Sequence, residues 1–310
     1  MTSCAETGRK FVTGHRLEFT CLVASRDAVG ESPLWHPEQH CLYWVDINSF
    51  RLNRFHPETH ELQAWKFEEP VTALALTTRP ECLLVALGGR LIVWDTVYGT
   101  ETPFTAVETS WPALRLNDGA AGPDGTFWVG SMQNNVAADG SELRITQDLG
   151  SLYRVTPQKE VIVCDRGFGI TNTIAWSPAR DRFFCGCSRR SELYVYRYEE
   201  RSGQVGERRL FANPADSGVP DGSAVNVAGM LWNCRHSGGC ILGFSPEGEI
   251  IHRILCPTRN VTNCVFGGDD LRTLFITTAA LGAPEGDVLA GHLFSLSMEV
   301  PGVPPYRFML

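Results

Sequence analysis

The sequence lacks long hydrophobic runs. No apolar stretch approaches the ~18 residues that a transmembrane helix needs. The N-terminal stretch MTSCAETGRKFVTGHRLEFT also lacks the uninterrupted apolar core of a signal peptide. We therefore expect a soluble, cytoplasmic protein that has no membrane partner.

Blocks of like charge are absent too. Charged residues make up 20% of the 310 residues, and the formal net charge is −8. A surface with an excess of negative charge repels polyanions, so nucleic acid is not an expected partner. The apolar share of 43% is ordinary for a folded protein and argues against disorder.

Several short catalytic and metal-binding motifs are missing. The 11 cysteines are scattered, and the pair Cys185 and Cys187 has no second pair at a zinc-site spacing. We expect reduced thiols, most of them in apolar strands as small hydrophobic side chains. Ser131 has no G-x-S-x-G surroundings and the histidines are scattered, so no Ser-His-Asp triad is indicated.

Sustained helical periodicity is also absent, which argues against a TIM barrel or a doubly wound fold. The chain instead contains a degenerate repeat of short apolar strands joined by turns such as Pro123-Asp124-Gly125. Six copies begin near residues 31, 71, 115, 170, 220 and 261, and a period of about 40 to 55 residues is typical of propeller blades. The sequence predicts an all-β fold, a six-bladed β-propeller with four-stranded antiparallel blades, as a single domain over residues 1–310.

Other features are interpreted within this fold. The recurring tryptophans are expected between blades: Trp35, Trp44, Trp128, Trp176 and Trp232. His236 is expected to be exposed, with a position at the channel rim as the alternative. Asp46 is expected to end a strand and cap a turn. The irregular stretches 134–149 and 281–287 are long enough to be functional loops.

Four polar residues stand where the inner strand of a blade is expected to begin: Glu31, Asn117, Asn172 and Asp221. Equivalent positions of different blades converge on the central channel, so these side chains become neighbours. Two carboxylates and two amide oxygens suit a hard divalent cation, and buried charges need such a partner. Taken singly, Asn117-Asp118-Gly119 and Asp221-Gly222 also fit plain turns, because Asn and Asp before Gly are common turn formers.

The order and phase of the motifs resemble the gluconolactonase/senescence-marker/regucalcin family over nearly the whole chain. The shared motifs include Gly30-Glu31-Ser32-Pro33, Tyr43-Trp44-Val45-Asp46, Arg115-Leu116-Asn117-Asp118-Gly119, Phe127-Trp128-Val129-Gly130-Ser131-Met132, Ile170-Thr171-Asn172, Pro220-Asp221-Gly222 and Phe266-Gly267-Gly268. The C-terminal blade and the Pro-Asp-Gly-Ser motif are most similar to bacterial aldonolactonases, which act on pentonolactones and hexonolactones.

The resemblance implies roles for five residues. Glu31, Asn172 and Asp221 match the metal ligands of the family, and Asp221 also matches its proposed general base. Asn117 matches a residue that contacts substrate or metal-bound water, and Arg115 one that binds substrate hydroxyls. The implied cofactor is one divalent cation, with Ca, Zn, Fe(II), Mn and Mg left open. The implied partner is a small sugar lactone, hydrolysed by a monomer or weak homodimer.

The chain departs from the family pattern at three places. Thr173 stands where the family usually has Gly, and Asn226 where it usually has Asp. An acidic residue is usual near the end of the fourth blade's second strand, where this chain has Phe184-Cys185-Gly186-Cys187-Ser188. Two alternatives stay open, and the Cys187 and Asn226 departures favour the first of them. One is a non-catalytic divalent-metal-binding regulatory protein, and the other is a promiscuous esterase or organophosphate hydrolase of the same fold.

Overall fold

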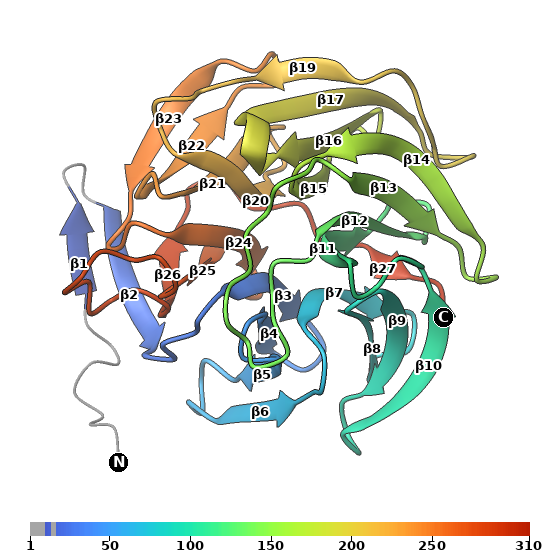
Figure 1. The fold of residues 1–310 in the computed structure, drawn as a ribbon. Helices are drawn as coiled ribbons and strands as arrows, with labels where there is room; N and C mark the ends of the chain where they lie inside the picture. Colours follow the sequence, from blue (N-terminus) through green and yellow to red (C-terminus); the bar gives the residue numbers. More distant parts are fainter. Residues whose placement is uncertain (1–9, 14–16) are drawn as a thin grey trace.

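Six small sheets surround a central axis in the computed structural model (Figure 1). The structure describes residues 10–13 and 17–310, so part of the N-terminal stretch considered as a signal peptide lies outside the described residues. The described part contains no α-helix, only the 3₁₀ turn η1 (Ser188–Arg190). None of its helices could cross a membrane. The predicted six-bladed β-propeller is confirmed.

Each blade begins with an inner strand and runs outward. The first blade contains β3 (Gly30–His36), β4 (Cys41–Asp46), β5 (Arg51–Phe55) and β6 (Leu62–Lys66). The second contains β7 (Val71–Thr77), β8 (Cys82–Leu87), β9 (Arg90–Asp95) and β10 (Thr100–Ala106). The third contains β11 (Leu114–Ala121), β12 (Phe127–Gln133), β13 (Gly150–Val155) and β14 (Val161–Phe168).

The fourth blade contains β15 (Thr171–Trp176), β16 (Arg182–Cys187) and β17 (Glu192–Glu199), with its outer edge divided between β18 (Gln204–Val205) and β19 (Arg209–Ala212). The fifth contains β20 (Val219–Val225), β21 (Leu231–His236), β22 (Cys240–Phe244) and β23 (Ile250–Leu255). The sixth contains β24 (Val261–Gly267), β25 (Thr273–Thr278), β26 (Leu293–Ser297), β2 (Leu17–Val23) and β1 (Lys10–Thr13). The predicted blade starts therefore match the inner strands.

The hydrophobic core is divided among the blade interfaces. Within the described residues, six apolar clusters lie one between each pair of neighbouring blades. The five tryptophans predicted to lie between blades are all buried, and Trp128 and Trp176 meet edge to face between the third and fourth blades. The ten described cysteines are free thiols, most of them buried, as predicted. Asp46 ends β4 and accepts a hydrogen bond from the Ser49 amide, also as predicted.

Every inner strand has a break in its register near its start. The breaks lie between Glu31 and Leu34, Val71 and Ala73, Leu116 and Gly119, Asn172 and Ala175, Pro220 and Ser223, and Val261 and Asn263. A β-bulge turns consecutive residues away from the regular alternation, and bulges are common beside functional sites. Here the bulges lie at one end of the central channel and change the direction of the side chains there.

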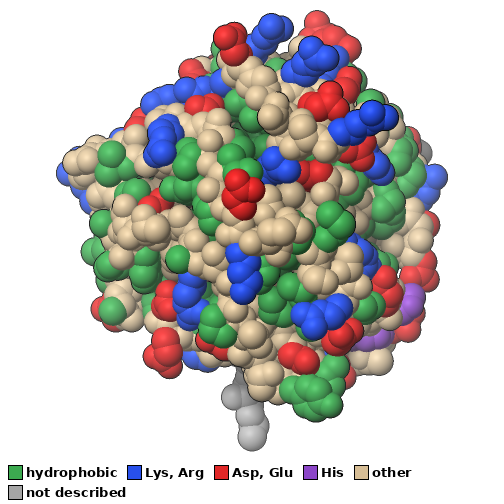
Figure 2. Space-filling view, turned by 90° about the vertical axis from the view of Figure 1, so that its right-hand side faces the viewer, with side chains coloured by type: hydrophobic (Ala, Val, Ile, Leu, Met, Phe, Trp, Pro, Cys, Tyr) green, Lys and Arg blue, Asp and Glu red, His purple; other side chains and the backbone are tan. Residues whose placement is uncertain are grey.

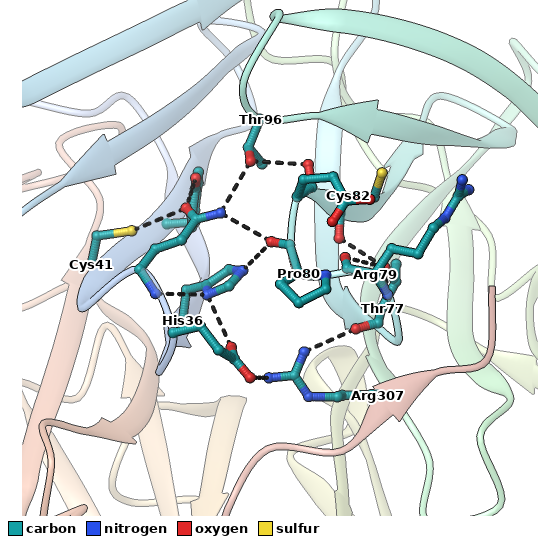
Figure 3. Close-up of polar contacts among 12 residues, drawn as sticks. His36, Cys41, Thr77, Arg79, Pro80, Cys82, Thr96 and Arg307 are labelled. Atoms are coloured by element: carbon teal, nitrogen blue, oxygen red, sulfur yellow. Dashed lines mark hydrogen bonds and ion pairs between the residues drawn. The ribbon is translucent and has the colours of Figure 1, made fainter.

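Two terminal segments close the ring. The N-terminal strand β2 pairs with β26, so the sixth blade combines both ends of the propeller sequence. At the opposite end of the channel from the bulges, β27 (Arg307–Phe308) adds a parallel strand to β7. Figure 3 shows Arg307 bridging the first two blades by an ion pair with Glu38 and a hydrogen bond to the Thr77 carbonyl oxygen. The prediction of four-stranded antiparallel blades therefore needs one addition: some sheets have a fifth strand, and β27 pairs with β7 in parallel.

Figure 2 shows how charged side chains are distributed over one face of the molecule. Acidic and basic side chains are interspersed over this face, with hydrophobic side chains between them. No large patch of a single sign is visible there.

Candidate active site

The five predicted site residues line one cavity of about 230 Å³ at the bulged end of the channel. Glu31 comes from β3, Arg115 and Asn117 from β11, Asn172 from β15 and Asp221 from β20. Residues from four blades thus converge on one space, as the repeat predicted. Four of them lie at or within the register breaks of their strands: Glu31, Asn117, Asn172 and Asp221.

A chain of hydrogen bonds orients the two amides. Arg115 Nη1 donates to Asn117 Oδ1 over 2.7 Å, and Asn117 Nδ2 donates to Asn172 Oδ1 over 3.0 Å. Asn172 Nδ2 then donates to Ser188 Oγ over 2.8 Å. The hydroxyl of Ser188 donates to the Pro220 carbonyl oxygen over 2.7 Å. This chain crosses from the third blade to the fifth and ends beside Asp221.

Hydrogen bonds hold the side chain of Arg115 in place, and it forms no ion pair with a carboxylate among the described residues. Its Nε and Nη2 both donate to Asn135 Oδ1, over 3.0 and 2.7 Å, and Nη1 also donates to the Leu116 carbonyl oxygen. Burial lowers the pKa of the guanidinium to about 10, which leaves it charged at neutral pH. The side chain is therefore a fixed cationic donor at the wall of the cavity.

Three buried carboxyl groups lie near the same point. Burial raises the pKa of Glu31 to about 7, with a further contribution from Asp118, and burial raises the pKa of Asp118 to about 6. Burial and the nearby Glu31 raise the pKa of Asp221 well above its ordinary value. Concentrated negative charge in a buried site disfavours ionisation of each group.

Sequence reasoning missed three residues of this site. Asp118 follows Asn117 in the same bulge, and its carboxylate accepts hydrogen bonds from the amides of Gly119 and Ile174. Asn263 donates to Glu31 Oε2 over 2.9 Å from the sixth blade. Asn135 holds Arg115 from an irregular segment. The polar side chain in VTNCVF was a usable signal for Asn263, whereas nothing in the pattern around Asn135 indicated its position.

The donor set fits a hard divalent cation. In the described structure neither Arg115 nor Arg235, the buried guanidinium groups nearby, donates to Glu31, Asp118 or Asp221. Buried carboxylates without a cationic partner are costly, and oxygen-rich clusters of this kind suit Ca²⁺ or Mg²⁺. No group of three His, Cys, Asp or Glu side chains in the described chain is arranged to hold a metal. A site here therefore needs an amide oxygen as a ligand.

An irregular segment covers the cavity. We call residues 134–149, between β12 and β13, the lid segment; it extends across the front of the ring in Figure 1. Asn48 Nδ2 donates to the Gly140 carbonyl oxygen over 2.8 Å, and Asp148 forms ion pairs with Arg189 and Arg190. Asn135, Glu142 and Ile145 of the lid segment line the cavity. Leu281, from the second predicted loop, lines it too.

Other positions singled out in the sequence can be placed. His236 lines the cavity and is half-buried, so it belongs to the rim and is not simply exposed. Asn226 accepts hydrogen bonds from Ala228 and Met230 in the turn after β20, at the opposite end of the channel. Cys187 is buried in the apolar cluster between the third and fourth blades. Two residues of the departures lie beside Asn172 and the main chain near Asp221: Ser188, at the end of the Phe184–Ser188 run, and Thr173.

A comparison with protein families matches this chain over residues 29–280 to the SMP-30/Gluconolactonase/LRE-like region. The chain belongs to the SMP-30/gluconolactonase/LRE-like family. The predicted family is confirmed. Pentonolactonase XacC of Haloferax volcanii is 33% identical over 93% of this chain and 97% of its own length. The 6-deoxy-6-sulfogluconolactonase of Pseudomonas putida is 30% identical over 91% and 95%.

Another relative and two solved structures are similar to this chain over nearly its whole length. Regucalcin of Gallus gallus is 27% identical over 94% of this chain and 98% of its own length. A calcium-binding regucalcin of Agrobacterium tumefaciens has a TM-score of 0.86 at 24% identity, covering 94% of this chain and 97% of that chain. A luciferin-regenerating enzyme has a TM-score of 0.87 at 25% identity, covering 95% and 100%. The propeller is thus shared over almost the whole chain.

Proposed function

We propose that this protein hydrolyses a sugar lactone, an aldono-1,4- or aldono-1,5-lactone such as glucono-, xylono- or arabinonolactone, to the aldonic acid. The observation that carries the proposal is the convergence of Glu31, Arg115, Asn117, Asn172 and Asp221 on one cavity. The relatives named pentonolactonase and 6-deoxy-6-sulfogluconolactonase support a carboxylic ester hydrolase of this type. At about 230 Å³, the cavity is below the roughly 300–1,000 Å³ usual for drug-sized ligands, which favours a small substrate.

In this proposal the residues of the cavity have different roles. Glu31, Asn172 and Asp221 hold one divalent cation, with Ca, Zn, Fe(II), Mn and Mg as the candidates. When bound, the cation supplies a Lewis acid that polarises the lactone carbonyl. Arg115 and Asn117 bind and orient the ring hydroxyls by directional hydrogen bonds. The lid segment keeps bulk water away from the bound lactone.

Asp221 moves the proton. A bound cation would lower the raised pKa of Asp221 and keep this side chain ionised. Its carboxylate then takes a proton from a water molecule while the water oxygen attacks the lactone carbonyl carbon. The bond between that carbon and the ring oxygen then breaks, and the proton passes to the ring oxygen as a hydroxyl group forms. The products are the open-chain hydroxy acid and the regenerated carboxylate, so atoms and charge balance.

The test is hydrolysis of a lactone panel after chelation and after return of single divalent cations. We expect chelation to abolish turnover and one of the five cations to restore it. Asp221→Asn keeps the size and one oxygen but removes the base, so turnover should fall by about 10²–10⁴-fold. Asp270→Asn, in an exposed turn, is the matched control. Full turnover without metal, or near wild-type turnover in Asp221→Asn, would refute the assignment.

Two other functions remain as outcomes of the same assay. The relatives named regucalcin and the calcium-binding neighbour favour a non-catalytic divalent-metal-binding regulatory protein, which would bind cation and hydrolyse nothing in the panel. The apolar side chains of Ile47, Ile145 and Val219 in the cavity favour an esterase or organophosphate hydrolase. Faster turnover of phenyl acetate or an organophosphate than of any sugar lactone would support that function.

We also propose a cytoplasmic location and a monomeric or weakly dimeric state. The free thiols of the ten described cysteines are one reason, because reduced thiols persist in the cytosol. Size-exclusion chromatography coupled to light scattering at several concentrations measures the oligomeric state directly.

A further inference from the structure

Thr173 has a backbone conformation that its side chain disfavours. It follows Asn172 within the register break of β15, it is fully buried, and its φ is 59°. Among residues 10–13 and 17–310 it is the only β-branched residue with a positive φ. Such a residue in the left-handed region is strained, by an amount of order 1–3 kcal/mol, and persists only where its surroundings hold it. Glycine would adopt this conformation without strain.

The surroundings that hold Thr173 are hydrogen bonds of its hydroxyl group. Thr173 Oγ1 donates to the main-chain carbonyl oxygen of Asp221 in the neighbouring blade. Thr173 Oγ1 also accepts a hydrogen bond from Asn233 Nδ2 over 3.2 Å, and it lies 3.2 Å from Ser223 Oγ. A glycine would lose all of these contacts. The strained residue therefore supplies a polar connection between β15 and β20 that an unstrained glycine lacks.

A second connection reaches the same carbonyl oxygen from within the fifth blade. Asn233 Nδ2 donates to the Asp221 carbonyl oxygen over 3.0 Å, and Asn233 Oδ1 accepts from Arg235 Nη1 over 2.9 Å. Arg235 is fully buried and also donates to the carbonyl oxygens of Ser217 and Gly218. The main chain of Asp221 is thus held from two sides, by Thr173 and by Asn233.

Thr173 acts from outside the cavity, since it does not line it. Space for its side chain is provided by Gly186 on β16, where a Cβ atom would lie 3.2 Å from Thr173 Oγ1 and 3.3 Å from Thr173 Cβ. Any influence on chemistry must therefore pass through the main chain of Asp221 and through Asn172, its sequence neighbour. This arrangement separates Thr173 from residues that would touch a substrate.

We propose that Thr173 is a positioning residue: its hydroxyl fixes the main chain of Asp221 relative to Asn172, and so sets the spacing of two cation ligands on neighbouring blades. The inference rests on the proposed function for the roles of Asp221 and Asn172. Partners that orient metal ligands typically change metal affinity or activity about 10–100-fold when removed. A residue that only filled space would change stability and leave affinity unaltered.

Three variants at position 173 distinguish the effect of the hydroxyl group from the effects of backbone strain and of side-chain packing. Thr173→Ser keeps the hydroxyl, Thr173→Gly removes both hydroxyl and strain, and Thr173→Val keeps the shape without the hydroxyl. Affinity for Mn²⁺ and for Ca²⁺ is measured by isothermal titration calorimetry, with kcat, KM and Tm measured on the same preparations. Thr173→Gly is the decisive variant, because it is compatible with the φ of this position.

We expect Thr173→Gly to bind the cation at least about tenfold more weakly and to lose kcat, with KM unchanged and a small change in Tm. Thr173→Ser should restore affinity and kcat to within about threefold of wild type. Wild-type affinity and kcat in Thr173→Gly would overturn the inference, as would equal losses in the serine and glycine variants. If Thr173→Val does not fold, the serine and glycine variants decide.

The same data distinguish this inference from the proposed function. Wild-type protein that binds a cation but hydrolyses no lactone overturns only the lactonase activity, and the affinities of the variants then decide the role of Thr173. Wild-type protein that binds neither Mn²⁺ nor Ca²⁺ overturns the inference, because no ligand spacing would then need to be set.

Discussion

The absence of a side chain at Gly222 leaves the space that the side chain of Asn263 occupies. A Cβ atom at this position would lie 1.9 Å from Cγ of Asn263, a distance that real atoms do not reach. The space is therefore needed for the Asn263 side chain, which donates to Glu31 from the sixth blade. Gly222, within the register break of β20, thus leaves room for a side chain of the neighbouring blade.

Replacing Gly222 should disturb the site through this contact. In Gly222→Ala the Asn263 side chain must move and lose its hydrogen bond to Glu31, whose pKa that bond lowers. We expect lactone turnover to fall at least about tenfold, as for other partners of ligand groups. Gly206→Ala is the matched control, because the nearest atom to a Cβ there is 3.5 Å away. Equal turnover in the two variants would contradict this reading.

Asp27 predicts a pH dependence of stability that does not involve the cavity. Burial, followed by the charge of Asp46, raises the pKa of Asp27 from 3.8 to about 7, although Trp44 Nε1 donates to it. The folded protein therefore keeps this proton at pH values where the unfolded chain has lost it. Such a group makes stability fall as pH rises from about 4 to about 7, and the loss is complete above that range.

Asp27→Asn removes this titration. Relative to wild type, the variant should gain stability as pH rises through the same window, by up to about 4 kcal/mol from the difference in pKa. Urea unfolding at pH 4.5, 6 and 8 measures the gain, with the exposed Asp270→Asn as the control. A stability difference that is constant over this range would show that Asp27 does not titrate as described.

At the scale of elements, the lid segment is attached to the first blade by the hydrogen bond of Asn48 and to the fourth blade by partly exposed ion pairs. Asp148→Ala removes its ion pairs with Arg189 and Arg190. Exposed ion pairs contribute only about 0–1 kcal/mol, so Tm should change little. A less firmly held lid should raise KM severalfold with a smaller effect on kcat. Glu200→Ala, which removes the exposed pair with Arg180, is the control; an unchanged KM for Asp148→Ala would mean that this attachment does not affect substrate binding.

The inner strands were predictable from sequence, and the outer edges were not. Each inner strand carries an apolar run and a turn signal, so the starts near 31, 71, 115, 170, 220 and 261 agree with the structure to within one residue. The outer strands β14, β18 and β19 face solvent, so no apolar pattern constrained them. The two-residue strand β27 depends on tertiary contacts. Parallel pairing to β7 has no local signature.

The candidate site was predictable where its residues repeat in phase. Glu31, Asn117, Asn172 and Asp221 occupy equivalent places, and the channel brings them together. The bulges were not predictable, because a register shift changes which side chains share a face without changing composition. For that reason the sequence around Asp118 indicates only a turn. Asn135 was missed because it belongs to an irregular segment.

At the scale of the whole molecule, the C-terminal strand should stabilise the ring without affecting the site. Phe308 is fully buried and meets Phe104 edge to face, with ring centroids 5.4 Å apart. Phe308→Ala should cost about 3–5 kcal/mol in urea unfolding, as for other buried phenylalanines. Turnover below the unfolding transition should be unchanged, because β27 lies at the other end of the channel. Met309→Ala, half-exposed, is the control; equal stability of the two would contradict the expected role.

The closure of the ring by β2 has a consequence for synthesis of the chain. Phe19 pairs with Leu296 and Cys21 with Phe294. Strand β2 is therefore synthesised before all six inner strands, but it can pair only after β26 has been synthesised. Contacts of such long sequence separation form slowly, because a large loop has to close before they stabilise anything. Until β26 leaves the ribosome, the edges of the first and fifth blades that face the sixth stay uncovered, and chaperones can bind such exposed apolar surface. Stalling translation before residue 293 should therefore leave a nascent chain without the cavity, since Asn263 and Glu31 meet across the last interface to close.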